Sequence, residues 1–117
     1  MYNIRTLNQI SHIGLQKLPA SEFIISDTEE NPDGIIVRSF DMHNMTLPEN
    51  LLAVARAGAG TNNIPVEKCT ERGIPVFNTP GANANAVKEL VLTGLLVSSR
   101  KVIEGANWTQ TLVNSDN

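Results

Sequence analysis

Short apolar runs alternate with polar segments along this chain, and the alternation predicts its secondary structure. Runs bounded by polar, glycine or proline residues predict β-strands at 2–7, 22–26, 34–37, 53–56 and 76–77. The segments between them predict short helices at 13–18, 47–52 and 66–72. Strands that alternate with helices form a parallel sheet with helices on both faces. The pattern therefore predicts a three-layer α/β fold.

Punctuating residues support the predicted helix ends. Ser11 precedes the first helix as a candidate N-cap, and Pro19 closes that helix. Pro48 lies in the first turn of the second helix, and Gly73 follows the third. The acidic segment 27–33, broken by a proline, is a predicted loop.

The last predicted helix, from Ala86 to about Gly105, has apolar residues in almost every direction around its axis. They are Val87, Leu90, Val91, Leu92, Leu95, Leu96, Val97, Val102 and Ile103. A helix of this kind is covered on more than one side. In so small a domain the helices lie outside the sheet, so the pattern favours cover by another domain or subunit over a central core helix.

Length and composition indicate one small cytoplasmic domain. The chain has 117 residues and a net charge of −3 without blocks of like charge, which argues against nucleic-acid grooves and membrane-surface patches. Its single cysteine, Cys69, excludes an intrachain disulfide, and the polar start Met1–Arg5 lacks the apolar core of a secretory signal. No apolar stretch approaches the roughly 20 residues of a membrane span.

Candidate binding residues follow the predicted strands. Arg38, Arg56 and Asn78 stand at strand ends that share one edge of a parallel sheet, where ligands collect. Gly58-Ala59-Gly60 begins like a dinucleotide fingerprint, but Asn63 stands where the third glycine belongs and Pro65 follows, so the match fails. The loop can instead offer backbone N–H groups to a carboxylate or phosphate, and a purely structural turn is an equal alternative.

Two arginines at one edge can clamp a carboxylate and a phosphate. The alternative for each arginine is an ion pair with a nearby carboxylate such as Asp41. Ser39 and Asn83 can add neutral hydrogen bonds, although Asn83 and Asn85 are also candidate caps of the last helix.

Nothing in the sequence predicts a catalytic residue or a metal site in this chain. His12 and His43 have no acid spaced for a proton relay, and surface positions are predicted for both. Cys69 is predicted to be a small buried hydrophobe, and no Cys/His spacing suggests a metal.

Several segments resemble one enzyme family in order and spacing. They are 37–39, 55–63, 73–80 and 86–90. Together they are similar to the amino-terminal part of the D-3-phosphoglycerate dehydrogenases, within the D-2-hydroxyacid dehydrogenase family. The resemblance implies NAD-dependent oxidation of 3-phosphoglycerate to 3-phosphohydroxypyruvate, which opens serine biosynthesis. It also implies a flavodoxin-like or Rossmann-like substrate domain with a long C-terminal linker helix.

The resemblance also assigns residues. It implies that Arg38, Ser39, Arg56, Ala59 and Gly60 bind substrate. Asn83 would lie near the cofactor and the interdomain cleft. Where the family usually has an aspartate in the glycine loop, this chain has Asn62.

The family organisation implies a division of this chain. Residues 1–85 would be the substrate-binding domain, and residues 86–117 the interdomain helix and the start of a missing nucleotide-binding domain. The nucleotide fingerprint and the catalytic arginine, glutamate and histidine lie beyond Asn117, so the chain is expected to be inactive alone and not to bind NAD tightly. Expected partners are a small phosphorylated hydroxy acid and the missing domain.

Two other functions remain open on the sequence. One is a stand-alone binding or regulatory module that pairs through its apolar last helix, including with a second copy of itself. The other is a flavodoxin-like cofactor binder, which is disfavoured because no loop has a Ser/Thr-rich phosphate nest.

Overall fold

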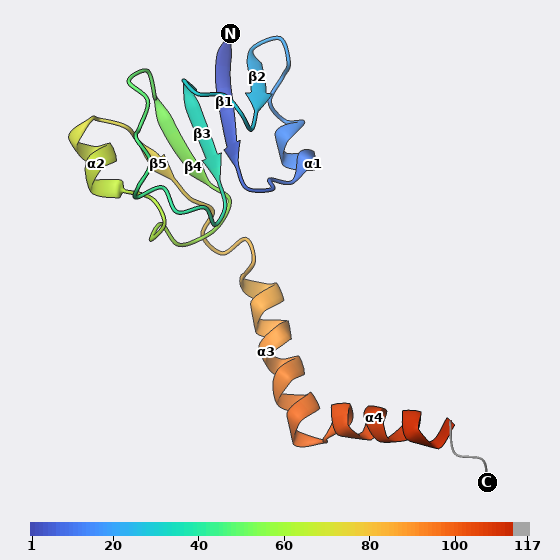
Figure 1. The fold of residues 1–117 in the computed structure, drawn as a ribbon. Coiled ribbons are helices and arrows are strands. Elements are labelled where there is room, and N and C mark those ends of the chain that lie inside the picture. The colour runs from blue at the N-terminus through green and yellow to red at the C-terminus, as the bar shows by residue number, and fades with distance from the viewer. Residues whose placement is uncertain (114–117) are drawn as a thin grey trace. The chain divides into compact units, whose positions relative to one another are not determined.

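The computed structural model describes residues 1–113, which fall into two compact units, Met1–Ala82 and a second from Asn83 onward (Figure 1). The first unit contains a five-stranded sheet with strand order β2-β1-β3-β4-β5, in which every pairing is parallel. The strands are β1 (Tyr2–Leu7), β2 (Phe23–Ser26), β3 (Gly34–Val37), β4 (Ala53–Arg56) and β5 (Val76–Phe77). The predicted strands and the α/β fold class are confirmed.

The strand order creates a switch point between β1 and β3. From β1 the chain passes to β2 on one side, and it then builds β3, β4 and β5 outward on the other side. Helix α1 (His12–Leu15) lies in the β1–β2 connection and α2 (Val66–Glu71) in the β4–β5 connection. Connections between parallel strands are right-handed as a rule, so two crossovers that run in opposite directions are expected to place α1 and α2 on opposite faces of the sheet. Crevices for ligands form beside such a switch point, at the carboxyl ends of the strands.

The hydrophobic core lies on the central strands. Ile35, Val37 and Val54 are almost completely buried, as expected for a parallel strand packed on both faces. Met42 and Ile64, from the connections that follow β3 and β4, belong to the same buried cluster. The core therefore fixes the carboxyl ends of β3 and β4, where Arg38 and Arg56 lie.

The predicted helix over 47–52 is wrong. The segment is irregular, although Leu47 and Leu51 are buried. The guanidinium group of Arg72, just after α2, donates to the carbonyls of Leu47 (2.9 Å), Pro48 (2.7 Å) and Glu49 (3.1 Å). A distant side chain thus satisfies all three carbonyls, and that of Pro48 also accepts a local turn bond, from Leu51 N–H (3.2 Å).

The first helix is shorter than predicted, because α1 ends at Leu15 instead of Leu18. Beyond it, Lys17 N–H donates to Gly14 O and Leu18 N–H to Leu15 O, which are tighter turn bonds. Pro19 restricts the residue before it and blocks continuation. Ser11 occupies the predicted N-cap position, but its side chain makes no cap bond.

Up to Val113, the second unit contains two helices where the sequence predicts one. Helix α3 spans Ala84–Ser99 and α4 spans Val102–Val113. Between them Lys101 has a φ of 50°, a left-handed conformation that ends a helix. The hydroxyls of Ser98 and Ser99 donate to carbonyls within the last turn, which competes with helical bonding.

Asparagine does not cap α3 through its side chain. Asn83 stands at the N-cap position without a side-chain cap bond. Asn85 lies inside the helix, where it donates to Glu89 (3.0 Å) and accepts from Lys88 (2.6 Å). Of the two candidates, Asn83 is therefore confirmed at the N-cap position without the side-chain bond, and Asn85 is wrong.

The apolar side chains of α3 and α4 are exposed. Leu90 is 72% exposed, Leu96 67% and Trp108, on α4, 62%. Despite this apolar surface, none of the helices within residues 1–113 is both long and apolar enough to span a membrane.

Candidate functional site

The carboxyl ends of four neighbouring strands form one edge of the sheet. Val37 pairs with Arg56, and Ala55 with Phe77, so Arg38, Arg56 and Asn78 share this edge as predicted. Leu7 pairs with Val37, which adds Asn8, directly after β1, to the same edge. We call this edge, with the loop 57–63 that follows β4, the carboxyl edge.

Arg56 links the segments of the carboxyl edge by hydrogen bonds. Its side chain is half-buried; Nε donates to Arg38 O (3.0 Å) and Nη1 donates to Asn62 Oδ1 (3.2 Å). A Cβ atom on Gly60 would lie 2.9 Å from Arg56 Nη1, and one on Gly58 would lie 3.2 Å from Arg56 Nε. The guanidinium therefore lies against the loop backbone, and a side chain at either glycine would have to displace it.

Two carbonyls of the loop accept hydrogen bonds from residues just after β5. Asn78 Nδ2 donates to Ala59 O (2.7 Å), and Thr79 N–H donates to Gly58 O (2.9 Å). Within residues 1–113, no group accepts a hydrogen bond from the backbone N–H of Ala59 or Gly60. Two adjacent amide donors are thus available beside Arg56.

Arg38 is exposed, and within the described part of the chain its guanidinium contacts neither a carboxylate nor any other acceptor. The alternative pairing with Asp41 is not formed; the Asp41 carboxylate accepts from His43 N–H (3.0 Å). Arg56 likewise has no carboxylate partner among residues 1–113. Both positive charges of the edge are therefore uncompensated by local acids.

Two asparagines of this edge are absent from the sequence-based set. Asn8 Oδ1 accepts from the N–H groups of Ser39 (2.9 Å) and Phe40. Asn63, which is buried, donates through Nδ2 to Phe40 O (2.8 Å) and Arg38 O (3.3 Å). An asparagine directly after a strand was the available signal for Asn8.

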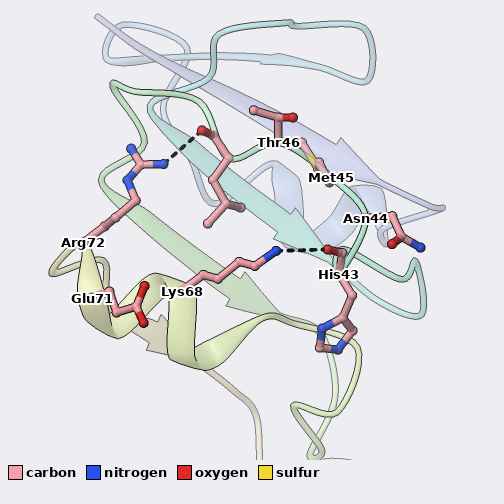
Figure 2. A pocket seen from close by; sticks show the side chains of 8 residues that line it. His43, Asn44, Met45, Thr46, Lys68, Glu71 and Arg72 are labelled. Atoms are coloured by element: carbon pink, nitrogen blue, oxygen red, sulfur yellow. Dashed lines mark hydrogen bonds between the residues drawn. The ribbon is translucent and has the colours of Figure 1, made fainter.

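A separate groove lies beside α2. It has a volume of about 660 Å³ and is lined by residues 43–47 together with Lys68, Glu71 and Arg72 (Figure 2). Arg72 donates to three backbone carbonyls, and Lys68 Nζ lies 3.5 Å from His43 O. Because its cations already face protein acceptors, this groove is a weaker anion site than the carboxyl edge.

The remaining candidate side chains are His43, His12 and Cys69, and their surroundings indicate structural roles. His43 Nε2 lies 2.9 Å from Asn62 O, and His12 Nε2 lies 3.0 Å from Gln16 Nε2; both histidines are exposed as predicted. Cys69 is fully buried as predicted, and burial raises the pKa of its thiol. Among the described residues no three His, Cys, Asp or Glu side chains gather as metal ligands.

The glycine loop does not fit a dinucleotide. The guanidinium of Arg56 occupies the space beside Gly58 and Gly60, where a pyrophosphate would have to approach. The next helix, α2, begins only at Val66, with Pro65 at its N-cap position, so no helix N-terminus lies behind the glycines. Asn83, which the resemblance places near the cofactor, belongs to the second unit, and its role stays a prediction.

Comparisons with known proteins agree with this fold. Residues 4–113 match the family model of the D-isomer specific 2-hydroxyacid dehydrogenase catalytic domain. The chain is 42% identical over 73 residues to a hydroxypyruvate reductase of Thermotoga maritima, covering 60% of this chain and 24% of that protein. It is 35% identical over 77 residues to a Staphylococcus epidermidis protein named "Putative 2-hydroxyacid dehydrogenase", covering 66% of this chain and 24% of that protein.

The chain spans about a quarter of the length of these curated relatives. The family match nevertheless covers both the parallel sheet and the helices that follow it. The chain therefore belongs to the D-isomer specific 2-hydroxyacid dehydrogenase family.

Proposed function

We propose that the carboxyl edge binds the carboxylate of a small 2-hydroxy or 2-oxo acid, and that the chain is the substrate-binding part of an NAD-dependent dehydrogenase. The observation that carries this proposal is the pair of arginines that have no carboxylate partner among residues 1–113 and lie beside the amide donors of Ala59 and Gly60. Guanidinium groups and backbone N–H groups are suited to planar carboxylates and to phosphates.

The substrate we propose is 3-phosphoglycerate, with serine biosynthesis as its setting. A phosphorylated hydroxy acid carries two anionic groups, and the edge offers two arginines. Arg56 keeps Nη2 and one Nη1 hydrogen beyond its two bonds within the protein, and the whole guanidinium of Arg38 is available. One group can then meet Arg38 while the other meets Arg56 and the loop amides.

A second candidate is hydroxypyruvate or glycerate without the phosphate. It is favoured by the name of the Thermotoga maritima relative, hydroxypyruvate reductase. With this ligand the extra positive charge of the edge would contribute mainly to attraction at a distance, not to a direct contact.

A titration followed by amide NMR tests both candidates on the 117-residue chain. We expect 3-phosphoglycerate to shift the amides of residues 38–40 and 57–60 and to bind more tightly than hydroxypyruvate. Arg38→Gln and Arg56→Gln should each weaken binding, whereas Arg100→Gln, with the same charge change at the α3–α4 junction, should not. Equal affinities for the two acids would favour the second candidate.

If neither acid shifts the amides at millimolar concentration, both candidates are contradicted. We then propose the binding-module function, in which α3 and α4 pair with another domain or a second copy. The exposed leucines of α3 support that alternative.

A further inference from the structure

The turn at Arg38–Phe40 is held by side chains from elsewhere in the chain. Asn8 Oδ1 accepts from both Ser39 N–H and Phe40 N–H. Arg38 O accepts from Arg56 and Asn63, and Phe40 O accepts from Asn63. The direction in which Arg38 and Ser39 leave β3 is thus set by residues that follow β1 and β4.

Asn8 is the part of this arrangement that crosses the switch point. Leu7 pairs with Val37, so Asn8 and Arg38 are the first residues beyond the paired strands β1 and β3. Asn8 has a φ of 70°, in the left-handed region that asparagine enters more readily than most residues. With this backbone conformation, the side-chain oxygen of Asn8 lies against two consecutive amides just after the neighbouring strand.

We propose that Asn8 is a positioning residue of the carboxyl edge, which orients Arg38 and Ser39 for the carboxylate or phosphate of the ligand. This inference rests on the function proposed above. Without the Asn8 oxygen, Ser39 N–H and Phe40 N–H lose their acceptor, and the turn gains alternative conformations in which Arg38 points elsewhere. The ligand then selects the productive conformation at a cost in affinity.

Hydrogen exchange on the unaltered chain gives the first test. Ser39 and Phe40 lie on the exposed surface, yet their amides have an acceptor; Ala59 and Gly60 are also exposed and have none among residues 1–113. We expect slow exchange at the first pair and fast exchange at the second. Equally fast exchange at all four amides would show that the Asn8 contact is not maintained, and would overturn the proposal.

Substitution gives the second test. Asn8→Gly keeps a residue that tolerates positive φ and removes the side chain with its accepting oxygen, so the fold should persist. We expect fast exchange at Ser39 and Phe40 and roughly tenfold weaker binding of 3-phosphoglycerate, about the effect of one or two lost hydrogen bonds. Asn8→Asp keeps an acceptor and should restore slow exchange at both amides, which a general loss of stability would not do.

Asn50→Gly is the matched control, because Asn50 likewise links two segments through its side-chain amide, although it donates, to the carbonyl of Asn31 (2.8 Å) before β3 at the opposite edge. It should leave the affinity unchanged. If the unaltered chain binds neither 3-phosphoglycerate nor hydroxypyruvate, the proposed function fails. If the unaltered chain binds and Asn8→Gly binds equally well, only the positioning role fails. Tighter binding by Asn8→Gly would mean that the Ser39 and Phe40 amides are ligand donors that Asn8 blocks, which also overturns the proposal.

Discussion

At the scale of single residues, Asn62 determines the charge beside Arg56. Its Oδ1 accepts from Arg56 Nη1 at 3.2 Å, and a neutral amide fixes the guanidinium without cancelling its charge. An aspartate would make the same contact as an ion pair. The geometry of the loop would change little, but the electrostatic potential at the carboxyl edge would fall.

We therefore expect Asn62→Asp to weaken the binding of 3-phosphoglycerate while leaving the thermal midpoint nearly unchanged. The loss of affinity should be larger for this ligand than for hydroxypyruvate, which carries fewer charges, and should shrink in high salt. Calorimetric titration at two salt concentrations measures it. Asn31→Asp, the same charge change in the loop before β3, is the control, and an equal loss there would contradict a local effect.

The sequence predicts the position of a residue well where that position depends only on the strand before it. Arg38, Arg56 and Asn78 follow apolar runs, so their common edge follows from parallel pairing alone. The contacts of Asn8 depend on which strand lies beside β1, and strand order cannot be read from the local pattern. The substrate roles of Arg38, Ser39, Arg56, Ala59 and Gly60 stay predictions until a ligand is measured.

At the scale of elements, the irregular segment 47–52 depends on α2. Arg72 donates to three consecutive carbonyls there, while the buried Leu47 and Leu51 anchor the segment in the core. A helical prediction from residues 47–52 alone fails because the deciding partner lies more than twenty positions later in the chain. Strands with compact apolar runs have no such dependence, and all five were predicted.

Arg72→Gln should lower the free energy of unfolding by about 2 kcal/mol, since hydrogen bonds from a charged donor to buried or half-buried carbonyls are lost. Urea denaturation measures this loss. Lys68→Gln, about one turn earlier, in α2, makes the same charge change but removes only a contact of 3.5 Å, and it should have little effect (Figure 2). A similar decrease in both variants would indicate that charge, not the three carbonyls, is responsible.

At the scale of the whole molecule, the two units differ in how much of their apolar surface their own residues bury. The first unit buries Ile35, Val37 and Val54 within one core. In the second, Leu90 and Leu96 are mostly exposed. The apolar pattern from Ala86 onward predicted a partner for these helices, and whether that partner is another domain or another copy stays a proposal.

We expect the isolated chain to self-associate in a concentration-dependent way, because burial of exposed leucine side chains is favourable. Light scattering coupled to size-exclusion chromatography measures the mass. Leu90→Glu combined with Leu96→Glu should shift the population to monomer, whereas Asn107→Glu, an exposed polar position on α4, should not. A monomer at every concentration tested would refute self-association.

The position of the single tryptophan makes the two units separately visible by spectroscopy. Trp108 lies on α4 and is largely exposed in the chain alone, and the sheet unit contains no tryptophan. Indole emission consequently reports on the environment of Trp108 in the helical unit, and the sheet unit has no indole of its own. Coincident curves from fluorescence and circular dichroism would therefore have to be demonstrated before any two-state treatment of this chain.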